Sequence, residues 1–274
     1  MPELPEVDTI VRQLRPHLVG RTIVSATLSH DDLLEAVSRT LLLRELRRRQ
    51  ITAVTRRAKH ALIHTDTNIL AVQPGMTGAL LRYDRALTPA EAKYAVLCCG
   101  LDDGAILVYR DVRRIGTLRW LTPAAWDKYQ ARLGPEPLDP EFTAEQFADR
   151  MSRSRSPIKK VLMDQRAVVG VGNIYANEAL FAARIDPSKP ASDVPRPQLI
   201  VLYHDVRRIL AAAIASEGTT FRDYVTGRGE PGNFQLEIVA YGREGERCVV
   251  CGTRLAATHS IDGRSTVFCW RCQT

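Results

Sequence analysis

Four cysteines late in the chain have the spacing of a metal-binding module. Cys248 and Cys251 form one C-x2-C pair, and Cys269 and Cys272 form a second pair seventeen residues later. Two such pairs are typical of four-cysteine zinc modules, and disulfides are uncommon in a reducing cytosol. We therefore predict that the four thiolates bind one structural zinc ion. The alternative is a redox-active or incidental C-x2-C motif.

The first residues, MPELPEV, could carry nucleophilic chemistry. Removal of Met1, which a small second residue permits, would expose the secondary amine of Pro2. An α-amine titrates near about 8, so a useful fraction is neutral at about pH 7 and can attack a sugar aldehyde or C1′ carbon. The iminium formed has no N–H to lose and stays cationic, which favours elimination. Glu3 is the adjacent candidate acid–base group, and Glu6 could orient the chain end. The alternative is an ordinary capped helix start.

Three further segments could contact a polyanion. Met76 lies between glycines in GMTG, and Arg113 and Ile115 lie in RDVRRIG, so these side chains could act as wedges between bases. Asn173 starts a helix after the turn GVGN, where free backbone N–H groups hold phosphate well. Arg264 lies in the loop IDGRST between the cysteine pairs, where a bound metal would hold it rigidly. Each segment also has an ordinary structural explanation, because methionine commonly fills gaps in a core and exposed arginines are usually solvated.

Composition and charge restrict the class of protein. The 274 residues are 45% hydrophobic and 25% charged, which is ordinary globular composition at a length that suits two domains. A net charge of +7 favours polyanionic partners, although charge alone supports only non-specific attraction. No apolar run approaches about 18 residues and no secretory signal is visible, so we expect a cytosolic protein without a membrane span.

The elements that must position the N-terminal candidates are one helix and a β-rich region. Helical spacing of apolar residues predicts a helix that begins at Pro5 and ends at Gly20. Short apolar or alternating runs from 22 to about 121 predict an antiparallel sandwich or barrel. Cys98 and Cys99 lie in one of these runs, which indicates a buried strand rather than a metal site.

The second half of the chain has a helical pattern. A proline-rich segment at 133–142 predicts a domain connection. Helices are predicted over 145–151, from a cap at Ser156-Pro157, from Asn173, and over 198–216. A strand from about Leu236 is predicted to lead into the zinc module.

Several long motifs occur together in the order found in one family. Besides the segments already quoted, they are RRAK at 56–59, LGPEPL at 133–138, LMDQRAVVGVGNIYANEALF at 162–181 and GTTFRDY at 218–224. Over its whole length the chain resembles bacterial formamidopyrimidine-DNA glycosylase, also called 8-oxoguanine DNA glycosylase. The resemblance implies an α+β, multidomain enzyme. An N-terminal antiparallel β-sandwich with flanking helices would span 1–132, a helix-two-turn-helix domain with a lesion-recognition loop 133–235, and a zinc-finger β-hairpin 236–274.

The resemblance also implies a bifunctional glycosylase and AP lyase of base-excision repair. The enzyme would flip out 8-oxoguanine or formamidopyrimidines, excise the base through a Schiff base on Pro2, and cleave the strand by β,δ-elimination. Glu3 would be the acid–base partner. Lys59, in the matching RRAK, would contact phosphate and assist β-elimination, and Arg264 would hold a phosphate and assist the δ step.

The remaining implied roles concern the grip on DNA. Met76, Arg113 and Ile115 would fill the gap left by the flipped nucleotide, with Arg113 facing the orphaned cytosine. Lys159 and Asn173 would hold the backbone, and residues 219–234 would fold over the base as a glycine-rich lid.

The chain departs from the family pattern at several DNA-contact positions. Gln73-Pro74 replaces the usual His-Leu, Val112 a Pro and Ile115 a Phe, and Lys93-Tyr94-Ala95-Val96 replaces Lys-His-Asp-His. Tyr94 stays in the predicted DNA-binding set, although the histidine contact with phosphate is lost. These changes leave the opposite-base preference open and do not touch the nucleophile.

The resemblance implies a monomer that acts on damaged double-stranded DNA in the bacterial cytoplasm, at the nucleoid, with no membrane association. Two other functions stay open. An endonuclease VIII-like glycosylase would act on oxidised pyrimidines, whereas the PELPE start and the intact second half favour the purine branch. A non-catalytic, zinc-dependent DNA-damage-binding protein would not need Pro2 and Glu3, so their presence with Lys59 and Arg264 argues against it.

Overall fold

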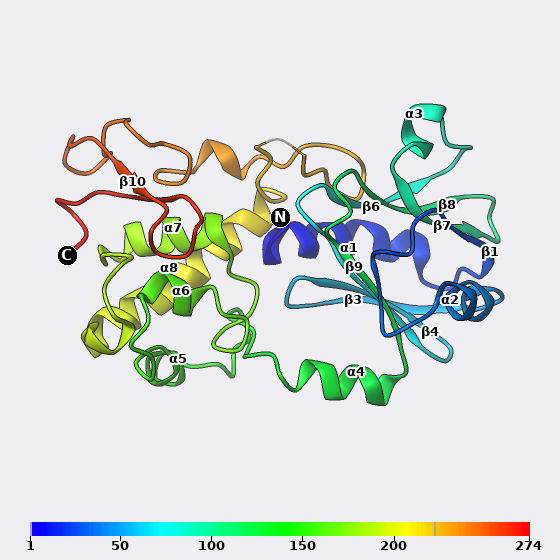
Figure 1. Cartoon of the computed structure of the whole chain (residues 1–274), viewed down its shortest axis with the longest axis horizontal. Helices are drawn as coiled ribbons and strands as arrows, with labels where there is room; N and C mark the ends of the chain where they lie inside the picture. Colours follow the sequence, from blue (N-terminus) through cyan, green and yellow to red (C-terminus); the bar gives the residue numbers. More distant parts are fainter. Residues whose placement is uncertain (1, 222) are drawn as a thin grey trace. The chain divides into compact units, whose positions relative to one another are not determined.

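The computed structural model describes residues 2–221 and 223–274, which pack into two compact units (Figure 1). The first unit contains the described residues up to Ala131 together with Ser216–Asn233, and the second contains Arg132–Ala215 and Phe234–Thr274. The segment 216–233 therefore packs with the N-terminal residues, although it follows the helical residues in sequence. The four-cysteine module packs with the helices in one unit. The three domain boundaries stay a prediction.

The first unit is an antiparallel β-sandwich, as predicted. Its strands are β1 (Ile23–Leu28), β2 (Leu34–Glu35), β3 (Ile51–Arg57), β4 (His60–Thr65), β5 (Ile69–Gln73), β6 (Gly78–Tyr83), β7 (Ala95–Leu101), β8 (Ile106–Asp111) and β9 (Thr117–Leu121). One sheet has the order β1-β7-β8-β6, and the other has the order β2-β9-β5-β4-β3, in which the short β2 runs parallel to β9. The β3–β4 turn carries Lys59 and the β5–β6 connection carries Met76, so the sheets determine where these side chains lie.

The first unit also contains the helices α1 (Leu4–Leu18), α2 (Arg39–Leu46), α3 (Pro89–Ala92) and α4 (Pro123–Gln130). The predicted apolar face of α1 is buried, and residues such as Ile10 and Leu14 share one core with residues of both sheets. The helix begins at Leu4, so Pro5 lies one position further in than predicted. Proline is tolerated there because the first backbone N–H groups of a helix have no acceptor within it.

The second unit is helical with a small hairpin. Its elements are α5 (Ala144–Met151), α6 (Ile158–Leu162), α7 (Asn173–Ala182), α8 (Arg196–Ala215), the 3-10 turns Ala191–Asp193 and Phe234–Leu236, and the strands β10 (Ala256–Thr258) and β11 (Thr266–Phe268). The helix predicted from Ser156-Pro157 is present, with Pro157 at the N-cap of α6, but no side chain caps it. Nowhere in its described helices does the chain have the length and apolarity of a membrane span.

The predicted strand from Leu236 is also wrong. Residues 234–236 form a 3-10 turn, and the described chain from 237 to 255 contains turns rather than a strand. The carboxylate of Glu178 on α7 accepts hydrogen bonds from the backbone N–H groups of Val239, Ala240 and Tyr241 at 2.7 to 3.0 Å. A side chain therefore takes the donors that a strand would offer to a neighbouring strand.

Candidate active site and metal centre

The start of the chain is held in place by a buried carboxylate. Pro2 is buried immediately before α1, and the backbone N–H of Glu3 donates to Glu6 Oε2 at 2.8 Å. The Glu3 side chain in turn accepts from the backbone of the first helical turn, so the two glutamates cap the helix reciprocally. The other carboxylate oxygen of Glu6 accepts from the backbone N–H of Thr219 at 2.8 Å. Glu6 thus joins the residues beside Pro2 to the segment 216–233.

Two further residues of this segment complete the anchor. The Tyr224 hydroxyl lies 3.3 Å from the carbonyl oxygen of Glu6 and 3.1 Å from that of Glu217. Burial, with the negative charge of Glu6 as a further cause, raises the pKa of Tyr224, so the phenol stays protonated and can donate. Gly218 has φ +85°, and a Cβ there would lie 3.1 Å from Glu6 Cγ. Sequence analysis identified Glu6 as an orienting group but missed these partners, which lie more than 200 positions away.

Lys59 is presented by a turn that a buried histidine anchors. Ala58 has φ +53° at this turn, and Lys59 itself is only 6% exposed. His60 is buried, its Nε2 lies 3.2 Å from the Tyr129 hydroxyl, and its ring meets the edges of the Trp126 and Tyr129 rings. Burial first, and then the charge of Arg119, lowers the pKa of His60 to about 4, so the ring is neutral near neutral pH. Sequence analysis missed His60, although its position directly after RRAK could have pointed to it.

The three predicted wedge residues lie in two neighbouring turns. Met76 is 44% exposed and Ile115 is 49% exposed, so both apolar side chains are accessible to a partner. The Arg113 guanidinium donates to the Met76 sulfur at 3.2 Å. The structure therefore brings Met76 and Arg113 together at the surface of the first unit, as a wedge requires.

Asp111, at the end of β8, organises both turns. This carboxylate is 1% exposed and accepts five hydrogen bonds. The donors are the Thr77 hydroxyl at 2.5 Å, the Tyr109 hydroxyl at 3.1 Å, and the backbone N–H groups of Arg113, Arg114 and Gly116 at 3.3, 3.2 and 2.9 Å. One buried side chain thereby fixes the backbone on both sides of Ile115 and the Thr77 side chain next to Met76. Sequence analysis quoted Asp111 within RDVRRIG but gave it no role.

Close packing explains the glycines of these turns. A Cβ on Gly116 would lie 1.9 Å from the Tyr109 hydroxyl oxygen, and one on Gly75 would lie 2.6 Å from the backbone nitrogen of Gly116. Tyr94 lies beside this cluster, because its carbonyl oxygen accepts from the backbone N–H of Asp111 at 3.1 Å. The Lys93 ammonium lies 5.1 Å from the centre of the Tyr94 ring.

In the second unit, Lys159 and Asn173 meet the backbone beside Arg264. Lys159 Nζ donates to the Ser265 carbonyl at 3.2 Å and to the Thr266 hydroxyl at 2.6 Å, and Lys159 is fully buried. Asn173 Nδ2 donates to the same Ser265 carbonyl at 3.1 Å. Both side chains therefore fix the position of the hairpin that carries Arg264, and a direct contact of Lys159 with phosphate stays a prediction.

The four cysteines predicted as metal ligands form one cluster. Their sulfur atoms all lie within 4.8 Å of one another, with 3.9 Å between Cys248 and Cys272 and 3.5 Å between Cys251 and Cys269. A zinc ion with Zn–S bonds of about 2.3 Å requires sulfur separations of about 3.8 Å at a tetrahedral site. The cluster therefore fits a tetrahedral, thiolate-binding ion such as zinc, and all four thiols are free of disulfides.

The predicted site residues thus fall into two sets. Pro2, Glu3, Glu6, Lys59, Met76, Tyr94, Arg113 and Ile115 belong to the first unit, and Lys159, Asn173, Arg264 and the four cysteines belong to the second. Within each unit the structure brings most of them together through Glu6, Asp111, Ser265 or the sulfur cluster. Each of these links includes residues that are distant in sequence.

Comparison with known proteins gives matches over the whole chain. Residues 1–118 match the family model described as the formamidopyrimidine-DNA glycosylase N-terminal domain, and residues 133–225 match that of the formamidopyrimidine-DNA glycosylase H2TH domain. The chain is 44% identical to a formamidopyrimidine-DNA glycosylase of Stutzerimonas stutzeri (strain A1501) and 39% identical to one of Vibrio atlanticus (strain LGP32), with 100% of each chain covered.

Solved structures are similar over the same length. A complex of wild-type Lactococcus lactis Fpg (MutM) with N7-benzyl-Fapy-dG containing DNA matches at TM-score 0.90 and 30% identity, covering 100% of both chains. The MutM (FPG) protein of Thermus thermophilus matches at TM-score 0.88 and 35% identity, covering 99% of this chain and 98% of that one.

Proposed function

The chain belongs to the formamidopyrimidine-DNA glycosylase family, and we propose that it excises oxidised purines from double-stranded DNA and then cleaves the strand. Family membership makes it a DNA glycosylase of base-excision repair. The proposal adds the substrates, 8-oxoguanine and formamidopyrimidines, and the chemical steps below. Lactococcus lactis Fpg has been solved with such a formamidopyrimidine-containing DNA.

Pro2 is the proposed nucleophile, after removal of Met1, which lies outside the described residues. Its neutral amine attacks C1′, the N-glycosidic bond breaks, and the base leaves with a proton supplied through Glu3. Opening of the sugar ring gives a cationic iminium. Loss of a C2′ proton then expels the 3′ phosphate, and a second elimination expels the 5′ phosphate. Lys59 assists the first elimination and Arg264 the second, each by holding a phosphate.

The remaining residues hold the DNA in the extruded state. Met76 and Ile115 fill the space of the flipped nucleotide, and Arg113 faces the orphaned cytosine. Asn173, Lys159 and Tyr94 contribute to the backbone grip, directly or by fixing neighbouring segments. Residues 219–234 cover the extruded base. The enzyme is proposed to act as a monomer on DNA in the bacterial cytoplasm.

One structural zinc ion is proposed at Cys248, Cys251, Cys269 and Cys272. The ion supplies a rigid crosslink and takes no part in the chemistry. Its place is supported by the sulfur separations, which fit a tetrahedral site. The hairpin β10–β11 between the cysteine pairs then carries Arg264 on a fixed base.

The observation that carries the proposal is the fixed chain start. A chain terminus normally frays, whereas here Pro2 is buried and the next residues are bonded through Glu6 to the backbone of Thr219. A nucleophile at a terminus needs this order, because covalent catalysis depends on a fixed approach to the reacting carbon.

Borohydride trapping tests the proposal. The protein is incubated with a duplex carrying 8-oxoguanine opposite cytosine and with an abasic duplex, reduced, and the linked peptide is mapped by mass. A covalent adduct at Pro2 on both duplexes is the expected result, and Pro2→Gly should abolish it while DNA binding persists. No adduct with either duplex, from protein shown to lack Met1, would refute the catalytic proposal.

A second candidate substrate class is oxidised pyrimidines. Lactococcus lactis Fpg, at TM-score 0.90 and 30% identity, has also been solved with an oxidised-pyrimidine containing DNA. Single-turnover excision of 8-oxoguanine, a formamidopyrimidine and an oxidised pyrimidine in the same sequence context separates the two classes. We expect the purine lesions to be excised faster.

A further inference from the structure

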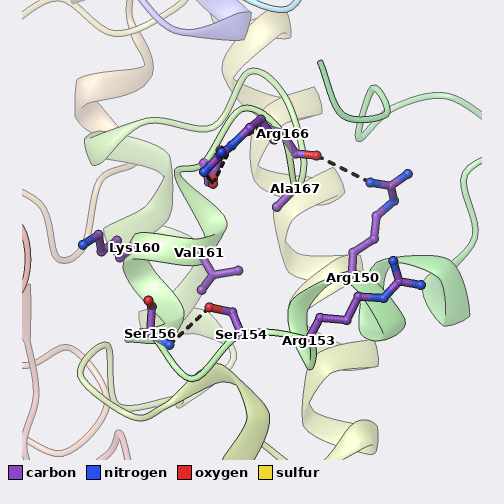
Figure 2. Close-up of a pocket in the computed structure, with 9 residues that line it drawn as sticks. Arg150, Arg153, Ser154, Ser156, Lys160, Val161, Arg166 and Ala167 are labelled. Atoms are coloured by element: carbon purple, nitrogen blue, oxygen red, sulfur yellow. Dashed lines mark hydrogen bonds and ion pairs between the residues drawn. The ribbon is translucent and has the colours of Figure 1, made fainter. Parts of the chain in front are cut away.

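The second unit has a basic pocket that none of the proposed catalytic steps uses. Its volume is about 520 Å³, and it lies where the end of α5, the start of α6 and the loop before α7 meet (Figure 2). The residues that line it include Arg150, Arg153, Ser154, Lys160, Asp164 and Arg166. Four cationic side chains face one carboxylate, which gives the lining a net charge of +3.

Three of the cations have no carboxylate partner within the described part of the chain. Asp164 is occupied by Arg166, whose guanidinium donates to both carboxylate oxygens at 2.7 to 3.2 Å and lowers the pKa of Asp164. Among the described residues, no carboxylate lies within 4 Å of the charged groups of Arg150, Arg153 or Lys160. Arg150 makes one long hydrogen bond, at 3.5 Å to the Arg166 carbonyl. The pocket thus concentrates uncompensated positive charge.

The rest of the lining is polar. The Ser154 hydroxyl accepts from the backbone N–H of Ser156 at 3.2 Å, so its own proton is available to a ligand oxygen. Val161 and Ala167 are the apolar members, and Figure 2 shows Val161 between Lys160 on one side and Arg150 and Arg153 on the other. Arginines, a lysine and hydroxyls around an open hollow match the chemistry of phosphate oxygens rather than that of an apolar ligand.

The neighbouring hollow indicates which phosphates these are. A second pocket of about 270 Å³ is lined by Lys160, Met163, Asp164, Asp262 and Arg264. Lys160 and Asp164 line both pockets, so the basic pocket lies next to the hollow that Arg264 lines. Arg264 is a proposed phosphate ligand. A DNA strand whose phosphate is bound by Arg264 would therefore have its neighbouring phosphates close to the basic pocket.

We infer that the pocket of Arg150, Arg153 and Lys160 binds backbone phosphates of the DNA strand outside the lesion. The inference rests on the proposed function for its choice of ligand. Phosphate contacts carry no sequence information, so the pocket adds affinity for damaged and undamaged DNA alike. The contacts therefore contribute equally before and after base extrusion.

The test is equilibrium binding of a fluorescent 25-base-pair duplex as a function of KCl concentration. The duplex is used undamaged and with one central tetrahydrofuran abasic analogue. Arg150→Ser/Arg153→Ser should lower the slope of log K against log salt by about 1.8, because each lost phosphate contact removes about 0.9. This decrease in slope corresponds to an affinity loss of about 60-fold at about 0.1 M salt. The loss should be the same for the undamaged and the tetrahydrofuran-containing duplex.

Two matched variants serve as controls. Arg150→Lys/Arg153→Lys keeps the charge and should keep most of the slope. Arg44→Ser/Arg208→Ser removes the same net charge at arginines whose side chains are 70% and 63% exposed and paired with Glu45 and Asp205. This second control should leave the slope unchanged. If the slope fell equally in Arg44→Ser/Arg208→Ser, the effect would come from overall charge rather than from the pocket, and the inference would be overturned.

The outcome is separable from that of the proposed function. Excision and trapping at saturating enzyme should be normal in the serine variant, and a wild-type protein that neither excises nor traps still yields a slope on undamaged DNA. An unchanged slope in the serine variant overturns the inference. The inference is also overturned if Arg150→Ser/Arg153→Ser loses binding to a poly-glutamate peptide but keeps its affinity for DNA, because the pocket would then bind an acidic protein.

Discussion

Asp111→Asn should disorder the turns that carry the proposed wedge. The carboxylate accepts three hydrogen bonds at Oδ1 and two at Oδ2. An amide offers one acceptor oxygen and one NH2 group. With the oxygen in the Oδ1 position, the NH2 group meets the N–H of Gly116, which then has no acceptor in a buried place.

The magnitude follows from these bonds. An unsatisfied buried N–H costs about 1 to 3 kcal/mol, and bonds to a charged acceptor are each about 1 kcal/mol stronger than those to a neutral one. The lower cost of burying a neutral side chain offsets part of this loss, so we expect about 3 kcal/mol less stability for the ordered turns. If DNA binds only to protein with ordered turns, part of the binding free energy is spent on ordering them, and the affinity for the duplex falls by up to about 100-fold.

Hydrogen exchange of residues 112–116 and binding of a tetrahydrofuran-containing duplex measure the two effects. Tyr109→Phe removes one donor and should give about a third of the effect, and Asp205→Asn on α8 should give none. Normal amide protection and normal affinity in Asp111→Asn would refute the role of Asp111. Lost protection with normal affinity would instead refute the wedge assignment of Met76 and Ile115.

Three other substitutions test the remaining anchors. The pKa of His60 is lowered to about 4 in the folded protein, so on acidification the unfolded chain takes up this proton at a higher pH than the folded protein does, and the free energy of unfolding falls as pH drops from about 6.5 towards 4. His60→Phe should remove about 2 kcal/mol of the stability loss between about pH 7.5 and 5, measured by urea unfolding followed by tryptophan fluorescence. Substitution of an exposed histidine, His17→Gln, should leave that loss unchanged. Cys251→Ser should reduce zinc content and DNA affinity together, because metal binding and local folding are coupled. The control Cys98→Ser on β7 should preserve both. Normal zinc content and normal DNA affinity in Cys251→Ser would contradict this prediction. In Glu178→Gln the amide oxygen can replace only one carboxylate oxygen, so at least one of the three backbone N–H groups loses its acceptor. Zinc release to a chelator should therefore accelerate, and an unchanged release rate would show that the 239–241 segment does not support the module.

Local patterns in the sequence were sufficient for part of the fold. The apolar spacing of Val7, Ile10 and Leu14 predicted α1, and the short apolar or alternating runs predicted an antiparallel sandwich or barrel, because the periods of a helix and a strand are local properties. The cysteine spacing predicted the metal site for the same kind of reason. The strand from Leu236 failed because a distant carboxylate, Glu178, takes its backbone donors.

The sequence by itself therefore determined the candidate nucleophile, the candidate metal ligands, most of the element types and the family. Only the tertiary structure decided which groups hold them in place. Thr219 reaches Glu6 across 213 positions, and Ser265 accepts from Lys159 across 106. Asp111 is adjacent in sequence to the turn it organises, yet its role depends on burial and on Thr77 from another strand connection. Such roles arise from hydrogen bonds between segments that only packing brings together, and no local period encodes them.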